Sequence, residues 1–188
     1  HHFGAGPRPV FKDPLRIGMA AGTAVSLLFT VIAYLLLFIQ PPPIFAGRFI
    51  LALIAWALLW FFTHDLAHLF VGTIAGIRFS HYYIGLSNIV RLGFLPKAFK
   101  TLVPALGIKI DREGSRASPT GYAAMYAAGP LASMILPLTV PIILLLNNPS
   151  SLAGLVLFAA SIANIAFTSY FSPRAGCFAK ALRALRRV

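Results

Sequence analysis

Acidic residues and cysteine are scarce in this sequence. Four Asp and Glu residues stand against 16 Lys and Arg in 188 residues, so the formal net charge is +12, and charged residues make up only 11% of the chain. A soluble domain carries about 25% charged residues, so this composition excludes an ordinary water-soluble surface. The one cysteine, Cys177, excludes an internal disulfide and a cysteine-based metal cluster.

The sequence contains several long runs without charged residues. A transmembrane helix needs about 20 apolar residues, and four segments reach this length: residues 17–39, 49–77, 121–146 and 152–171. Only the second contains acidic, basic or histidine side chains, those of His64, Asp65 and His68. We therefore expect an all-α membrane protein in which residues 1–188 form a single integral membrane domain with four transmembrane helices.

The basic residues predict the orientation of these helices. Lys and Arg of short loops stay on the cytoplasmic side of a membrane. Fifteen of the 16 lie before the first helix, in the loop 78–120 or in the basic tail 174–188, and Arg48 alone lies in a loop on the other side. Both termini should thus be cytoplasmic in a multi-pass integral membrane protein. The charge then faces the lipid bilayer, and no nucleic acid is expected as a partner.

The loop 78–120 is the one sizeable polar segment. Residues 77–84 are β-branched and aromatic, which is typical of a short strand or hairpin arm. Residues 89–110 mix apolar and spaced basic residues, which is typical of a segment in the membrane interface, and Pro96 and Pro104 prevent one long helix there. We expect a cytoplasmic loop that contains a short strand and interfacial segments.

The ionisable residues of the second segment form the pattern His-Asp-Leu-Ala-His at residues 64–68. Such residues are costly to bury in a bilayer, which indicates a function. His64 and His68 are four residues apart, so they project from one helix face and can hold one metal ion together. Alternatively, Ser, Tyr or backbone partners satisfy both rings, which then serve packing alone.

Zinc proteases use the related pattern His-Glu-x-x-His, in which the Glu takes a proton from metal-bound water. Asp65 occupies that position here, and its side chain is one methylene shorter than that of Glu. Its carboxylate would therefore reach the same water poorly. Asp65 is a degenerate general base in this interpretation.

A second motif, Ala-Ala-Gly-Pro at residues 127–130, lies near the start of the third transmembrane segment. With the histidine pattern and the strand-like residues 79–86, it resembles the site-2 protease family of intramembrane zinc metalloproteases, peptidase family M50. The resemblance covers roughly residues 49–185. It implies that His64 and His68 are zinc ligands near the cytoplasmic face and point toward Gly129 and Pro130. These two residues, with Asn164, would line a groove for a substrate or partner helix.

The third family motif is where the match fails. Family members carry Pro-x-Leu-Asp-Gly after the last core helix, and its Asp is the third zinc ligand. Aligned on residues 179–185, this chain has Ala175 at that position, and an alanine cannot bind zinc. His81 is the first candidate for a substitute ligand, followed by Asn164 and Cys177. Their structural alternatives are a loop residue, an interhelical hydrogen-bond donor and a small residue at a helix start, respectively.

Two altered catalytic positions, Asp65 and Ala175, predict a catalytically impaired pseudoprotease. Such a scaffold would hold a transmembrane helix of a partner or serve as a subunit of a larger membrane complex. Zinc is expected to be weakly bound or absent, because two imidazoles fall short of the three protein ligands of a catalytic site. The alternative is an active intramembrane zinc metalloprotease that cleaves transmembrane segments with a rearranged third ligand. A proton carrier or channel is less well supported, because the chain lacks an internal repeat.

Overall fold

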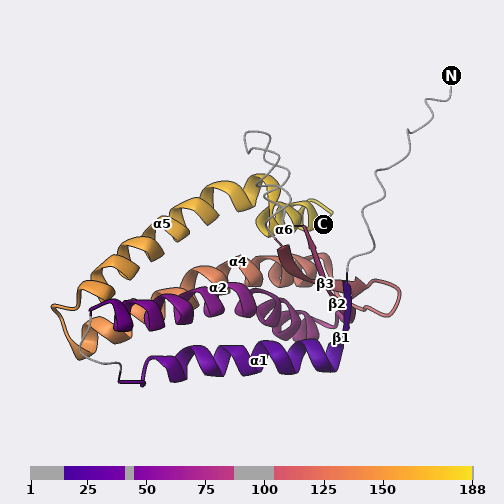
Figure 1. Cartoon of the computed structure of the whole chain (residues 1–188). Helices are drawn as coiled ribbons and strands as arrows, with labels where there is room; N and C mark the ends of the chain where they lie inside the picture. Colours follow the sequence, from indigo (N-terminus) through magenta and orange to yellow (C-terminus); the bar gives the residue numbers. More distant parts are fainter. Residues whose placement is uncertain (1–14, 41–44, 87–103, 188) are drawn as a thin grey trace.

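The computed structural model describes residues 15–40, 45–86 and 104–187. Within these ranges the chain forms five helices and three strands (Figure 1). In chain order they are β1 (Leu15–Gly18), α1 (Met19–Leu36), α2 (Phe45–Ala75), β2 (Arg78–Leu86), β3 (Pro104–Asp111), α4 (Pro119–Asn147), α5 (Leu152–Ala175) and α6 (Cys177–Leu185).

Four of these helices, α1, α2, α4 and α5, are long and apolar enough to cross a membrane. They correspond to the four predicted transmembrane segments, with bounds that differ by a few residues. Large apolar side chains on their outer faces are exposed, for example Phe70 and Ile74 of α2 and Leu146 of α4. Such a surface is unfavourable in water and suits a hydrocarbon environment.

Local signals in the sequence fix the ends of these helices. Gly76 follows α2 with a φ of +90°, a conformation that glycine adopts without strain. Ser118 precedes α4, and its hydroxyl accepts a hydrogen bond from the Gly121 backbone N–H at 3.1 Å. Ser151 caps α5 in the same way through Gly154, also at 3.1 Å. Both serines satisfy a backbone donor that a helix start leaves unpaired.

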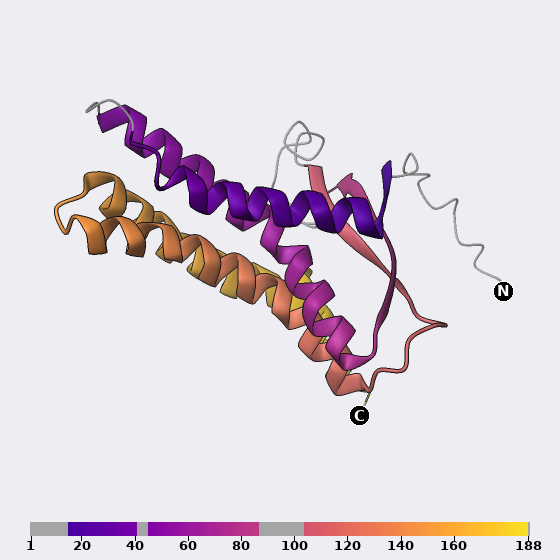
Figure 2. The same cartoon turned by 90° about the horizontal axis from the view of Figure 1, so that it is seen from below.

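The helices pack around α4. This helix lies against α2 along one side and against α5 and α6 on another, while α1 packs on α2 (Figures 1 and 2). Half of the residues of the main buried core between them are alanines, whose small side chains allow close approach of helix backbones. Its members are Ala33, Ala52, Ala55, Leu59, Val140, Leu144, Ala153 and Leu157.

Prolines within α4 require compensation from a neighbouring helix. Pro137 has no N–H and cannot bond to the Ser133 carbonyl four residues earlier, as a helix would demand. The Asn164 side-chain amide of α5 donates to this carbonyl instead, at 2.9 Å. The same side chain accepts from the Trp60 indole of α2 at 3.2 Å. Asn164 thus joins three helices, as its structural interpretation in the sequence predicted.

The three strands form one antiparallel sheet in the order β1-β2-β3 at one end of the helices. Tyr82 of β2 is fully buried over Gly22 of α1, and its hydroxyl lies 3.1 Å from the Thr23 hydroxyl. The predicted short strand is confirmed as β2. The sequence did not predict β1, which includes Ile17 and shifts the start of the first helix to Met19. The all-α description is therefore correct for the helices and incomplete for the sheet.

The rest of the predicted interfacial segment divides into two parts. Residues 104–110 belong to β3, a strand that the sequence analysis did not predict. β3 pairs with β2 along its whole length, and this pairing satisfies backbone groups that an interfacial helix would satisfy internally. Residues 89–103 of that prediction lie outside the described residues.

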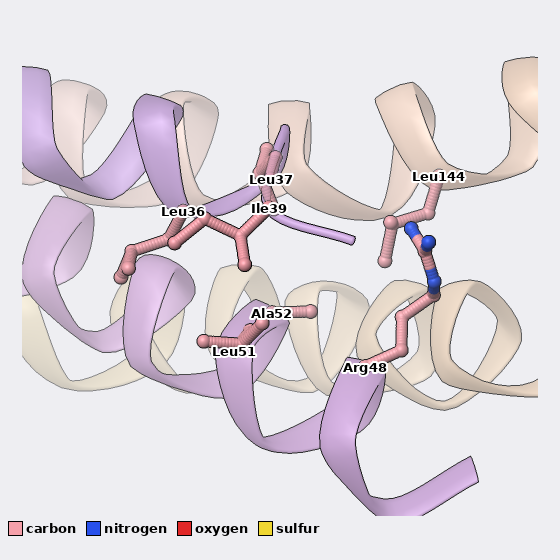
Figure 3. Close-up of a pocket in the computed structure, with 7 residues that line it drawn as sticks. All are labelled: Leu36, Leu37, Ile39, Arg48, Leu51, Ala52 and Leu144. Atoms are coloured by element: carbon pink, nitrogen blue, oxygen red, sulfur yellow. The ribbon is translucent and has the colours of Figure 1, made fainter. Parts of the chain in front are cut away.

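The opposite end of the helices contains a small pocket (Figure 3). It lies where α1 ends and α2 begins, and Arg48 extends across it toward Leu144 of α4. The remaining lining is apolar: Leu36, Leu37, Ile39, Leu51 and Ala52. One cation among aliphatic side chains offers no acid, base or nucleophile, so the candidate functional site lies elsewhere.

Candidate metal centre

His64 and His68 lie on the face of α2 that packs against α4. Their rings meet edge to face, with centroids 4.7 Å apart. Nδ1 of His68 lies 2.6 Å from the Met125 carbonyl oxygen, and Nδ1 of His64 lies 3.4 Å from the Ser133 hydroxyl oxygen. Both partners belong to α4, so the rings point into the protein, as the sequence predicted.

These partners determine which ring nitrogen carries the proton. A carbonyl oxygen only accepts, so Nδ1 of His68 is the protonated nitrogen and donates to Met125. The Ser133 hydroxyl donates to the Gly129 and Pro130 carbonyls, each at 3.2 Å, so it accepts from Nδ1 of His64. In both neutral rings Nε2 is then left with a free lone pair, the form in which histidine binds metals.

Cys177 brings a third donor to the two Nε2 atoms. The Nε2 atoms are 3.1 Å apart, and the Cys177 sulfur lies 3.4 Å from that of His64 and 3.5 Å from that of His68. All three donor atoms lie within 4.8 Å of one another. The thiol has one proton and satisfies one Nε2 at a time. The Nε2 lone pairs of His64 and His68 therefore share the single thiol proton of Cys177. A metal ion in place of that proton would bind both lone pairs and the sulfur at once.

The spacing of the donors fits a tetrahedral zinc ion. With Zn–N bonds of about 2.05 Å and a Zn–S bond of about 2.3 Å, tetrahedral angles place two nitrogens about 3.3 Å apart and nitrogen and sulfur about 3.6 Å apart. The corresponding separations here are 3.1, 3.4 and 3.5 Å. Small rotations of the side chains are enough to reach those values.

Gly129 provides space for this group on the α4 side. A methyl group at Gly129 would overlap Nε2 of His68 and would lie 2.9 Å from Nε2 of His64. Gly129 and its neighbour Pro130 are both buried. The Gly-Pro motif therefore places a side-chain-free surface of α4 directly opposite the donor atoms of the two histidines.

Asp65 lies beside the group and is almost fully buried, with 3% of its surface exposed. Its Oδ2 atom has no hydrogen-bond partner among the described residues. Lys180 lies one helical turn after Cys177 on α6, and its ammonium is 5.9 Å from the centre of the Tyr126 ring. Burial raises the pKa of the Cys177 thiol to about 11, and the Lys180 charge acts in the opposite direction. The metal-free thiol is thus neutral near pH 7, and a metal ion would displace its proton.

The structure places Cys177 beside the two histidines, whereas the sequence analysis ranked His81 first among the candidates for the third ligand. Ala175 ends α5, and the donor that joins the histidines is Cys177, two residues further along the chain. His81 lies on β2 with Nδ1 2.9 Å from the Ser80 hydroxyl and is not a member of the three-residue group. Cys177, which the sequence analysis placed behind His81 as a substitute ligand, is therefore the third member of the group that could hold a metal ion. The signal in the sequence was the lone cysteine close to the aligned ligand position.

Comparison with known proteins returned no match, whether with protein-family models, with curated proteins or with solved structures. The fold and the site therefore define the class of protein. It has four helices suited to a membrane and a buried group of two histidines and one cysteine that could hold a metal ion.

Proposed function

We propose that this chain is a site-2-protease-like membrane protein whose His64, His68 and Cys177 side chains hold one zinc ion. The observation that carries the proposal is the convergence of the three donor atoms, at separations of 3.1, 3.4 and 3.5 Å. The histidine pattern of residues 64–68 and the Gly-Pro motif beside it also support the family.

The distribution of charge supports an orientation with both termini and the α2–α4 connection in the cytoplasm. In this orientation the metal centre lies toward the cytoplasmic face, because His64 and His68 lie in the second half of α2, near the sheet and α6. A site at this depth is reachable by a transmembrane helix that unwinds near the membrane surface.

In this proposal the centre is impaired as a protease. A zinc ion with three protein ligands keeps one open position, where it activates water or a carbonyl. The general base that would take the proton from that water is Asp65, whose carboxylate is about 1.5 Å short of the reach of Glu because it lacks one methylene. The scaffold then serves mainly to hold a transmembrane helix of a partner, alone or in a larger membrane complex.

A second candidate function is an active intramembrane zinc protease with Cys177 as the rearranged third ligand. Two observations favour it. The three donors remove the shortage of ligands that argued against zinc, and Asp65 has a buried oxygen without a hydrogen-bond partner among the described residues. The two functions share the metal centre and differ only in the competence of Asp65.

The metal centre is tested on the full-length chain purified in detergent without chelator. We expect about one zinc per chain in the unmodified protein and loss of zinc in His68→Ala and in Cys177→Ala. His81→Ala is the matched control, since it removes a histidine outside the group, and it should retain zinc. A zinc-free unmodified protein, or zinc that depends on His81, would contradict the proposed centre.

Activity is tested with a helical transmembrane substrate in the same detergent. We expect no appreciable cleavage by the unmodified protein and zinc-dependent cleavage by Asp65→Glu, because the longer side chain restores the reach of the base. Cleavage by the unmodified protein that disappears in His68→Ala would establish the active protease and refute the impaired one.

A further inference from the structure

The third donor of the proposed metal centre is carried by α6, the shortest helix among the described residues. α6 has nine residues and follows α5 after a single joint residue, Gly176. The joint is held by Ser172 of α5, whose carbonyl accepts from the Gly176 N–H at 2.9 Å and whose hydroxyl accepts from the Phe178 N–H at 3.1 Å. Cys177 is the first residue of α6, so its position depends on how this helix is held.

α6 packs against α4 and α5. Its fully buried residues are Ala181 and Ala184, which pack against Tyr122, Ala123, Tyr126 and Ala127 of α4, and its first four residues are partly buried. Two alanine methyl groups contribute far less apolar area than the leucine and valine contacts of the main core. The fully buried side chains of α6 therefore contribute less apolar area than the core contacts of α2, which carries the two histidines.

The exposed side of α6 and the residues that follow this helix carry apolar and strongly basic side chains. Leu182 and Leu185 are each 46% exposed, and Arg183, Arg186 and Arg187 are exposed beside them. The structure gives these three arginines no ion pair with a described acidic residue. Exposed leucines flanked by unpaired guanidinium groups are typical of a helix that lies in a membrane interface against anionic headgroups.

The position of α6 fits such a surface. It continues directly from α5, which is long and apolar enough to cross the membrane, and it lies across the end of the helices next to the sheet (Figure 1). A short amphipathic helix that leaves a transmembrane helix at this point must lie near the headgroups. The charge of its exposed face selects an anionic leaflet rather than a zwitterionic one.

We propose that an anionic membrane leaflet binds the exposed face of α6 and thereby holds Cys177 against His64 and His68. The leaflet adds docking energy to the contacts of Ala181 and Ala184 with α4, so the third donor is held more firmly when the lipid surface is engaged. The consequence for metal affinity rests on the proposed function, whereas the docking of α6 does not.

Docking is tested without metal, using the one cysteine of the chain as the reporter. The metal-free protein is reconstituted in vesicles of phosphatidylcholine and in vesicles of phosphatidylglycerol, and the rate of maleimide labelling of Cys177 is measured with a neutral reagent. We expect labelling to be about tenfold slower in phosphatidylglycerol, because docked α6 keeps the thiol in the site. Equal rates in the two vesicles would overturn the proposal.

A pair of matched variants separates α6 from general charge effects. Replacement of Arg183, Arg186 and Arg187 by Gln should remove the difference between the two lipids. Replacement of Arg16, Arg78 and Arg116 by Gln removes the same number of exposed charges from other segments and should leave the difference intact. A lipid effect that disappears equally in both triple variants would also overturn the proposal.

The coupling to the metal site is measured by cobalt titration in the same vesicles. The absorption band of a thiolate bound to Co²⁺ reports on Cys177 alone, and we expect about tenfold tighter binding in phosphatidylglycerol. Anionic vesicles also concentrate Co²⁺ at their surface, but this effect is common to both triple variants, so only the α6 variant should lose the difference. Absence of cobalt binding in every vesicle would refute the metal centre, while the labelling rates would still decide the docking.

Discussion

Replacement of Gly129 by alanine should disrupt the proposed metal centre although it replaces none of the ligands. The added methyl group would lie 2.9 Å from Nε2 of His64, whereas ordinary contacts begin at 3.4 Å, so this ring must retreat by about 0.5 Å. The overlap with Nε2 of His68 is larger, and that ring must move further. Because metal–ligand distances tolerate only about 0.2 Å, the two histidines can no longer converge on one ion.

We expect Gly129→Ala to weaken cobalt binding by at least about 100-fold, which corresponds to about 2.7 kcal/mol of binding free energy. This factor is the upper end of the range for losing a residue that orients metal ligands. The measurement is a titration of the full-length protein in detergent, followed by the visible spectrum of Co²⁺. Gly121→Ala is the matched control on the same helix, because the contacts of its methyl group, at 3.2 and 3.5 Å, lie away from the site. Unchanged cobalt affinity in Gly129→Ala would refute the proposed position of the metal.

Two further predictions concern stability, measured by unfolding in detergent. Asn164→Ala should lower the free energy of unfolding by about 1 kcal/mol, because the Ser133 carbonyl loses its donor. In a Pro137→Ala background the backbone N–H of residue 137 replaces that donor, so the same substitution should lower it by less. An equal loss in both backgrounds would contradict this account. Gly22→Ala should lower the free energy of unfolding by about 1–3 kcal/mol, because its methyl group would overlap the buried tyrosine ring of β2. Gly18→Ala is the control and should be neutral, because its methyl group has open space around it. Similar effects of the two substitutions would show that the packing at Gly22 is looser than described.

The helices could be predicted from the sequence because their signals are local. An uncharged run of about 20 residues forms either a membrane helix or part of a large buried core. The ends of these helices coincide with local signals such as Gly76, Ser118 and Ser151. The strand β2 was also predictable, because its β-branched and aromatic residues are contiguous. β1 and β3 were not, because each pairs with β2 across a long sequence separation, and such pairing leaves no local pattern.

The candidate site likewise has one part that was predictable from the sequence and one part that was not. The pairing of His64 and His68 follows from helical periodicity, and burial of their rings against Gly129 follows from the cost of placing imidazoles in lipid. The role of Cys177 does not follow from either rule. Its sulfur meets the histidines only because α5 ends at Gly176 and α6 turns back along α4, which brings together residues more than one hundred positions apart.

By itself, the sequence determined the number of helices that are long and apolar enough to cross a membrane, the distribution of charge along the chain and two histidines that could bind a metal. Each of these depends on composition or on spacings of a few residues, which local physical chemistry controls. The tertiary structure alone decided the third donor, the bond of Asn164 to the Ser133 carbonyl and the three-stranded sheet. These depend on contacts between distant segments, and such contacts form only when helix packing fixes where each chain segment ends and turns.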